Sequence, residues 1–178
     1  MPLRVDGRGL ALLLGVNGAL VLLLAKLARP DLPVGKAIAV ALAASALLVV
    51  SAALHELAHL VVARRAGQAV GGLVLGHFGA CVLVDQGDPA ERELGATALY
   101  VAAGPVVSFA LWLGLAGLAD AVRTTSGTLA LALALASALN LALLALNLCP
   151  VEPLDGGRLL RCLTLAWQRR AGALAEGA

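Results

Sequence analysis

The chain has 178 residues, of which 61% are hydrophobic and only 13% are charged. A soluble domain is usually about 45–50% apolar and about 25% charged, so this composition indicates a membrane protein with one domain, residues 1–178. The net charge of +2 and the lack of a Lys/Arg block argue against a nucleic-acid-binding protein.

Four apolar stretches follow one another along the chain, and each approaches or exceeds the roughly 17–25 residues that span a bilayer. They are rich in Leu and Ala, which favour helices. Backbone groups in lipid must also be satisfied within their own segment. We therefore expect an all-α polytopic membrane protein with about four transmembrane helices. These helices are predicted over about residues 9–25, 37–63, 95–119 and 128–149.

The first stretch could instead be a cleaved signal peptide, because Arg4 and Arg8 give it a charged start. Its apolar run is long for that role, and no small-x-small cleavage site precedes Lys26. We therefore expect this stretch to be retained as a membrane helix.

The second stretch contains the run His55-Glu56-Leu57-Ala58-His59. Residues four apart lie on one face of a helix, about 6 Å apart along its axis, so the two imidazoles can bind one metal ion. Glu56 lies beside the first ligand, where a hydrolytic metal site needs a general base. Ionisable residues inside a span are costly and are usually functional. The alternative is a pair of histidines hydrogen-bonded inside a helix bundle.

The connection between the second and third stretches, residues 64–94, contains two β-prone runs around a turn with glycine. This pattern predicts a β-hairpin over about residues 73–84. The hairpin is apolar enough to associate with the membrane face, and a surface hairpin packed on the helices fits the pattern equally well.

The fourth stretch runs into a segment, residues 147–157, that contains the candidate third ligand. A catalytic zinc usually takes three protein ligands and leaves its fourth position to water. Pro150 and Pro153 cannot continue a helix, and the glycines at 156 and 157 loosen the backbone. We therefore expect the chain to be unwound at the metal site, where it passes Asp155. Taken alone, the segment would fit an ordinary helix stop outside the membrane.

Together these residues resemble the motifs of the site-2 protease family of intramembrane zinc metalloproteases. The run from His55 to His59 matches the first family motif, and the run from Asn147 to Gly156 matches the second. The resemblance covers roughly residues 45–165. Two shorter matches are Gly104-Pro105, in the intervening helix, and His77-Phe78-Gly79, where the family has a membrane-associated hairpin.

The resemblance implies a metal site and a reaction. His55, His59 and Asp155 would bind one Zn²⁺ per chain, and Glu56 would act as the general base. Asn147 would be the second catalytic side chain, holding the substrate backbone or the oxyanion. The implied activity is zinc metalloendopeptidase cleavage of peptide bonds within or near the transmembrane segments of membrane proteins.

The resemblance also implies partners. We expect Asn147, Phe78 and Gly79 to contact the substrate, and the hairpin to pair with its unwound segment as an added strand. The expected substrate is a single-span membrane protein already cleaved by another protease. The lipid bilayer is the second expected partner, and a regulatory membrane protein would be the third.

Three positions depart from the family pattern. Ala58 stands where the family usually has Gly, and a helix accepts this change easily because Ala favours helices more than Gly does. Ser108 replaces the Asn of the Gly-Pro-x-x-Asn motif, and its hydroxyl can also donate and accept hydrogen bonds. Glu152 is unusual beside the proline turn.

The basic residues predict the orientation, because Lys and Arg accumulate on the cytoplasmic side of a membrane protein. Of the 13 Lys and Arg residues, nine fall on the side of the N-terminus, the 64–94 connection and the tail, residues 158–178. We expect an integral protein of a bacterial cytoplasmic membrane, with its N-terminus and active-site opening toward the cytoplasm. The four basic residues on the other side are Lys26, Arg29, Lys36 and Arg123.

Two other functions fit parts of this pattern. A catalytically silent membrane scaffold of the same fold would bind zinc, but would have no use for Glu56 as a base. A small transporter would contain buried ionisable residues, but would not require Asp155 to follow two helix-breaking prolines.

Overall fold

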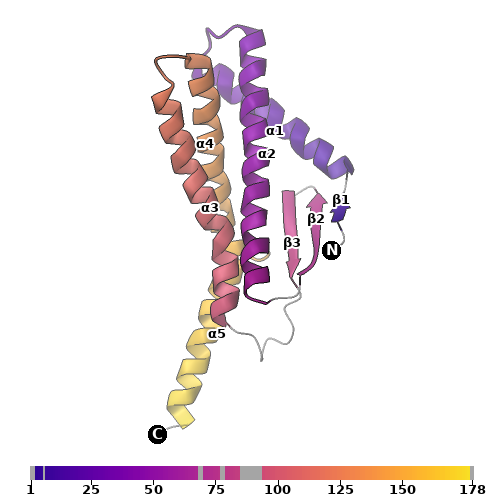
Figure 1. Ribbon diagram of the computed structural model, residues 1–178, viewed down its shortest axis with the longest axis vertical. Helices are drawn as coiled ribbons and strands as arrows, with labels where there is room; N and C mark the ends of the chain where they lie inside the picture. The colour runs from indigo at the N-terminus through magenta and orange to yellow at the C-terminus, as the bar shows by residue number, and fades with distance from the viewer. Residues whose placement is uncertain (1–2, 6, 68–69, 77–78, 85–93, 177–178) are drawn as a thin grey trace.

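The computed structural model describes residues 3–5, 7–67, 70–76, 79–84 and 94–176. Helices α2, α3 and α4 run side by side along the long axis, α1 crosses at an angle, and the strands lie beside α2 (Figure 1). The elements are β1 (Leu3–Val5), α1 (Gly7–Ala28), α2 (Val34–Arg65), β2 (Val70–Gly76), β3 (Gly79–Val84), α3 (Leu94–Ala121), α4 (Gly127–Asn147) and α5 (Asp155–Glu176).

Helices α2, α3 and α4 are each long and apolar enough to cross a membrane. Within the described residues, the apolar part of α1, Leu14–Ala28, is shorter, so a fourth span stays a prediction. The four helices lie where the sequence places them, although α4 ends at Asn147 instead of continuing to residue 149. The surface of the bundle exposes large apolar side chains such as Leu42, Leu99 and Val106, as expected where lipid covers them.

One end of the bundle, which we call the Lys36 end, is packed through small side chains. There α1, α2 and α4 meet in two buried clusters dominated by alanine. Small residues let helix backbones approach closely, which is how helices associate in lipid without a hydrophobic driving force. The buried members are Val21, Ala25, Leu32, Ala37, Val40, Ala41, Ala44, Ala132 and Ala136.

A three-stranded sheet has the order β1-β2-β3, with β1 parallel and β3 antiparallel to β2. The antiparallel pair lies within the connection where the sequence predicts a hairpin, but β2 begins earlier, at Val70. β1 was not predicted, because a three-residue strand carries no periodicity and its partner lies far along the chain. Residues 77–78 are outside the described residues, and contact of the sheet with a membrane stays a prediction.

The segment after α4 corrects the expectation for Asp155. Residues 148–154 form turns and bends, and Asp155 is the first residue of α5 instead of part of the unwound chain. The prolines end α4, while an acidic residue is favourable in the first turn of the next helix. A Cβ at Gly156 or Gly157 would overlap the turn backbone at Leu148 or Val151, so the two glycines let α5 start against the turn. The predicted tail, residues 158–178, is helical to Glu176 because it continues α5.

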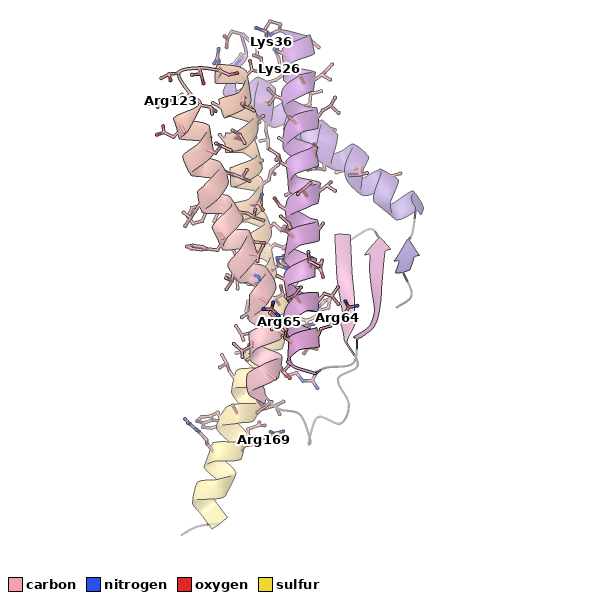
Figure 2. The ribbon with its side chains drawn as sticks, in the orientation of Figure 1. Lys26, Lys36, Arg64, Arg65, Arg123 and Arg169 are labelled. Carbon is pink, nitrogen blue, oxygen red and sulfur yellow. The ribbon has the colours of Figure 1, made fainter. Side chains whose placement is uncertain are left out.

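The two groups of basic residues lie at opposite ends of the bundle. Figure 2 shows Lys26, Lys36 and Arg123 at one end, and Arg64, Arg65 and Arg169 at the other. We call the second the Arg65 end. Lys26 binds the carbonyl oxygens of Pro30 and Leu32, each at 2.8 Å, and so closes the connection between α1 and α2.

Candidate metal centre

Three side chains from two distant parts of the chain converge inside the bundle, toward the Arg65 end. His55 and His59 come from adjacent turns of α2, and Asp155 comes from the start of α5. His55 Nε2 lies 3.1 Å from His59 Nε2 and 3.2 Å from Asp155 Oδ2. His59 Nε2 lies 3.3 Å from the same carboxylate oxygen. The three residues are buried, with exposed fractions of 3%, 5% and 8% respectively.

The spacing of these three atoms fits a tetrahedral zinc ion. Nitrogen and oxygen ligands lie about 2.0–2.1 Å from zinc, which places them about 3.3 Å from one another. The three measured separations, 3.1, 3.2 and 3.3 Å, cluster around that value. The donor set of two imidazoles and one carboxylate is also a usual one for a catalytic zinc site with one position left for water.

The hydrogen bonding of His59 supports the same conclusion. Its Nδ1 lies 2.7 Å from the backbone carbonyl oxygen of Tyr100 on α3. A carbonyl oxygen only accepts, so Nδ1 carries the proton and a neutral ring has its lone pair on Nε2. That lone pair faces the carboxylate of Asp155, which is also an acceptor. Two acceptors this close are stabilised by a cation between them.

Helix α3 contacts both candidate ligand rings. His55 Nδ1 shares a hydrogen bond of 2.8 Å with Ser108 Oγ, as His59 Nδ1 does with Tyr100. Between these two contacts, a Cβ at Gly104 would overlap the Nε2 atoms of both histidines. Glycine at this position is therefore required by the close approach of α3 to the candidate ligands.

Sequence reasoning did not assign a role to two of these α3 residues. Ser108 was noted only as a departure from the family motif, and Tyr100 contributes through a backbone oxygen that its residue type does not reveal. A signal was present for Ser108, because it is a polar residue within an apolar span and lies one helical turn after Gly104.

The other predicted site residues lie on the elements around the centre. Glu56 is half-buried and follows His55 on α2, while Asn147 is half-buried at the last position of α4. Gly79 is the first residue of β3, and Phe78 lies outside the described residues. The geometry thus joins the three candidate ligands, and the catalytic roles of Glu56 and Asn147 remain predictions.

Glu152 lies apart from the ligands. Its carboxylate is 3.4 Å from the guanidinium of Arg161 on α5, and both side chains are about half exposed. This contact links the turn to α5 on the protein surface, which accounts for an acidic residue beside the prolines. A second exposed pair, Asp120 and Arg123, lies at the other end of the bundle.

Several known proteins are similar to this chain in sequence, although no protein-family model matches it. The protein Rip3 of Mycobacterium tuberculosis, whose name assigns it to the zinc metalloproteases, is 38% identical over 74% of the chain. A zinc metalloprotease of Methanocaldococcus jannaschii is 37% identical over 66% of the chain. Each alignment covers 33% of the relative, so the chain spans about a third of the length of these curated relatives.

The fold gives a second comparison. The solved structure of the site-2 protease from Methanocaldococcus jannaschii superimposes with a TM-score of 0.58 at 26% sequence identity. That match covers 92% of this chain and 67% of the solved one. Sequence and fold comparisons agree on the protein class, and the metal-binding geometry fits it. The chain is thus similar in sequence to zinc metalloproteases and in fold to a site-2 protease, and both comparisons support the site-2 protease family.

Proposed function

We propose that this protein is an intramembrane zinc metalloprotease that cleaves peptide bonds within or near the transmembrane segments of membrane proteins. The observation that carries the proposal is the convergence of His55, His59 and Asp155 at tetrahedral ligand spacing. Two of the three candidate ligands, His55 and His59, lie on α2, a helix long and apolar enough to cross a membrane. Ionisable side chains in such a place are expensive to bury and are retained for function.

In the proposed hydrolysis, the candidate ligands and Glu56 have separate roles. His55, His59 and Asp155 hold one zinc ion, which when bound acts as a Lewis acid that polarises the scissile carbonyl and acidifies water. Glu56 removes a proton from the attacking water, whose oxygen forms a bond to the carbonyl carbon. The peptide C–N bond then breaks, and Glu56 passes the proton to the departing amine, leaving a carboxylic acid and an amine.

Asn147 is proposed to hold the substrate backbone or the developing oxyanion beside the reacting carbonyl. Its position supports this role, because it ends α4 directly before the turn that leads to Asp155. A side-chain amide offers both a donor and an acceptor, and a peptide backbone requires both.

The sheet offers a way to hold an unwound substrate segment. β2 is paired on both sides, so among the described strands β3 keeps an unpaired edge, and it lies between β2 and α2 (Figure 1). An extended segment added to that edge would run beside the helix that carries His55 and His59. Gly79, at the start of β3, and the neighbouring Phe78 would contact this segment.

The biological setting is proposed on the same basis. The distribution of basic residues between the two ends supports an N-terminus and active-site opening on the cytoplasmic side of a bacterial membrane. We propose single-span proteins, already cleaved by another protease, as substrates, because the family resemblance implies them. A regulatory membrane partner would control their access.

The test combines metal content with cleavage in the full chain reconstituted in detergent. The substrates are a panel of single-span reporter proteins, and the variants are Glu56→Gln and, as a control, Asp120→Asn. Asp120 is an exposed carboxylate at the Lys36 end, so its change should leave cleavage and zinc content unaltered. We expect wild type to contain about one zinc and to cleave, and Glu56→Gln to keep zinc while losing at least about 100-fold in rate.

Two results would overturn the proposal. If Glu56→Gln cleaved the panel as fast as wild type, Glu56 would not be the base. If wild type bound zinc but cleaved no member of the panel, the chain would be a silent zinc-binding scaffold.

A further inference from the structure

The two candidate histidine ligands are oriented by different kinds of group on α3. His59 Nδ1 faces a backbone carbonyl oxygen, that of Tyr100, at 2.7 Å. His55 Nδ1 faces a side-chain hydroxyl, that of Ser108, at 2.8 Å. The spacing of Tyr100 and Ser108 places both on the α3 face that contains Gly104, where an added Cβ would overlap both rings. The proton on His59 is therefore fixed by the backbone, whereas the proton on His55 depends on one side chain.

A serine hydroxyl can satisfy His55 in two ways, and only one of them is compatible with a metal. If the hydroxyl donated to Nδ1, the neutral ring would carry its proton on Nε2. That proton would point at Asp155 Oδ2, 3.2 Å away, and His55 could not be a ligand. If the hydroxyl oxygen accepts from Nδ1–H, Nε2 keeps the lone pair that binds metal.

We propose that Ser108 is a positioning residue for the metal site: its hydroxyl oxygen accepts the Nδ1 proton of His55 and thereby fixes both the tautomer and the orientation of that ring. The inference rests on the zinc site of the proposed function. It assigns a role to the position at which this chain has Ser where the family motif has Asn. Both side chains present an oxygen acceptor, so the change of residue type keeps the function that the ring requires.

The burial of Ser108 makes its hydroxyl hard to replace. The residue is 0% exposed, so water cannot take the place of the hydroxyl at the ring. In Ser108→Ala, Nδ1–H of His55 would face a methyl group and lose its partner, at the cost of an unsatisfied buried donor. The ring would then favour the other tautomer, with its Nε2 proton donated to Asp155, which competes with zinc.

The matched control is Ser137→Ala on α4. Ser137 is also a buried serine in a membrane helix, but its hydroxyl donates to the backbone carbonyl of Trp112 at 2.9 Å. Its removal costs a similar hydrogen bond and changes no contact of a metal ligand. A purely structural effect of losing a buried hydroxyl would therefore appear equally in both variants.

The first readout is zinc affinity, measured by competition with a chromophoric chelator on the full chain in detergent. We expect Ser108→Ala to weaken zinc binding about 10–100-fold, as loss of the partner of a ligand histidine typically does. The zinc affinity of Ser137→Ala should stay within about 3-fold of wild type, because Ser137 contacts no candidate ligand. If the two variants bound zinc alike, Ser108 would have no special role and the inference would fail alone. If wild type itself bound no zinc, the metal site and the inference would both fall.

The second readout includes a wild-type measurement, which does not depend on whether a variant folds. The chain has three histidines, so nitrogen-15 labelling of histidine gives a spectrum that can be assigned by substitution. In zinc-loaded wild type, we expect His55 to carry its proton on Nδ1 and a metal-shifted signal on Nε2. In zinc-free protein, Ser108→Ala should move the His55 proton toward Nε2, whereas Ser137→Ala should not. An unprotonated His55 Nδ1 in zinc-loaded wild type would overturn the inference.

Discussion

The Lys36 end and the Arg65 end of the bundle are held together in different ways. At the Lys36 end, α1, α2 and α4 pack through alanines that leave little room for side-chain chemistry. Toward the Arg65 end, α2 meets α3 and α5 through imidazoles, a hydroxyl and a carboxylate, beside a smaller apolar cluster of Ala63, Tyr100 and Val101. Helix α2 belongs to both regions, so the same helix provides a packing surface in one and candidate metal ligands in the other.

The difference shows how a small membrane protein can hold ionisable groups in an apolar bundle. Buried polar groups destabilise a membrane protein unless each has a partner. At the centre, the Nδ1 atom of each candidate ligand histidine has a hydrogen-bond partner on α3. The Nε2 atoms and Asp155 Oδ2 face one another and would share a metal ion. The Lys36 end contains the larger apolar clusters and none of the candidate ligands. Changes in the two regions should therefore separate metal binding from stability.

The largest expected effect follows removal of the carboxylate ligand. Asp155→Ala leaves only two imidazoles at the centre, and zinc affinity should fall by more than the roughly 10–100-fold typical of losing an indirect partner. Chelator competition measures the change. Glu152→Gln is the control, because it alters an exposed carboxylate on the adjacent turn. Equal zinc affinity in Asp155→Ala and wild type would remove Asp155 from the ligand set.

Substitution of Gly104 should have the next largest effect on zinc binding. In Gly104→Ala the new Cβ would overlap Nε2 of both histidines, so the rings or α3 must shift and zinc affinity should fall at least about 10-fold. Gly114 lies on the same helix, but a Cβ added there would have no neighbouring side chain or element within 4 Å. The Gly114→Ala variant should therefore bind zinc as wild type does. Identical zinc affinity in the two variants would show that α3 does not approach the centre this closely.

An enlarged side chain at the Lys36 end should reverse the pattern, lowering stability and sparing the metal. Ala136 is fully buried between helices, so Ala136→Leu should cost about 1–3 kcal/mol through overpacking. Unfolding in denaturing detergent, monitored by circular dichroism, measures the loss. Ala43→Leu provides the control, because Ala43 is exposed on α2. A strong loss of zinc affinity in folded Ala136→Leu would mean that the two regions are coupled.

The smallest effect is expected for the polar contact between α2 and α4. Asn140 Nδ2 donates to Ser51 Oγ at 3.1 Å in the buried interior. A double-mutant cycle with Asn140→Ala and Ser51→Ala should give a coupling free energy of about 0.6 kcal/mol, typical of such contacts in membranes. Coupling above about 2 kcal/mol would exceed the known range for one contact and indicate a larger network around Asn140.

Sequence reasoning placed the helices well, because apolar length and helix propensity are local properties. It also identified His55, His59 and Asp155 as ligand candidates, since spacing and helix breakers are visible along the chain. It could not place Asp155 at the start of α5, because that start depends on a close approach of Gly156 and Gly157 to the turn backbone, where a Cβ would overlap it. Contacts of this kind arise only after the chain has folded.

The α3 contacts show the same limit. The contact of Ser108 with His55 joins two helices far apart in sequence, and Tyr100 acts through its backbone. Strand β1 is too short to have a periodic pattern and pairs with β2 across the length of α1 and α2. Each of these features depends on which distant segments of the chain lie side by side, and local periodicity does not reveal that.

X-ray absorption spectroscopy at the zinc edge tests the central claim most directly. With the zinc-loaded full chain, we predict about one zinc per chain with two imidazole nitrogens, and with oxygen in the remaining shell at about 2.0–2.1 Å. Cys149 is the nearest cysteine in sequence to Asp155, and its thiol instead donates to the carbonyl oxygen of Ala145 at 3.5 Å. A sulfur ligand at about 2.3 Å, or a shell with fewer than two imidazoles, would contradict the assignment of His55, His59 and Asp155.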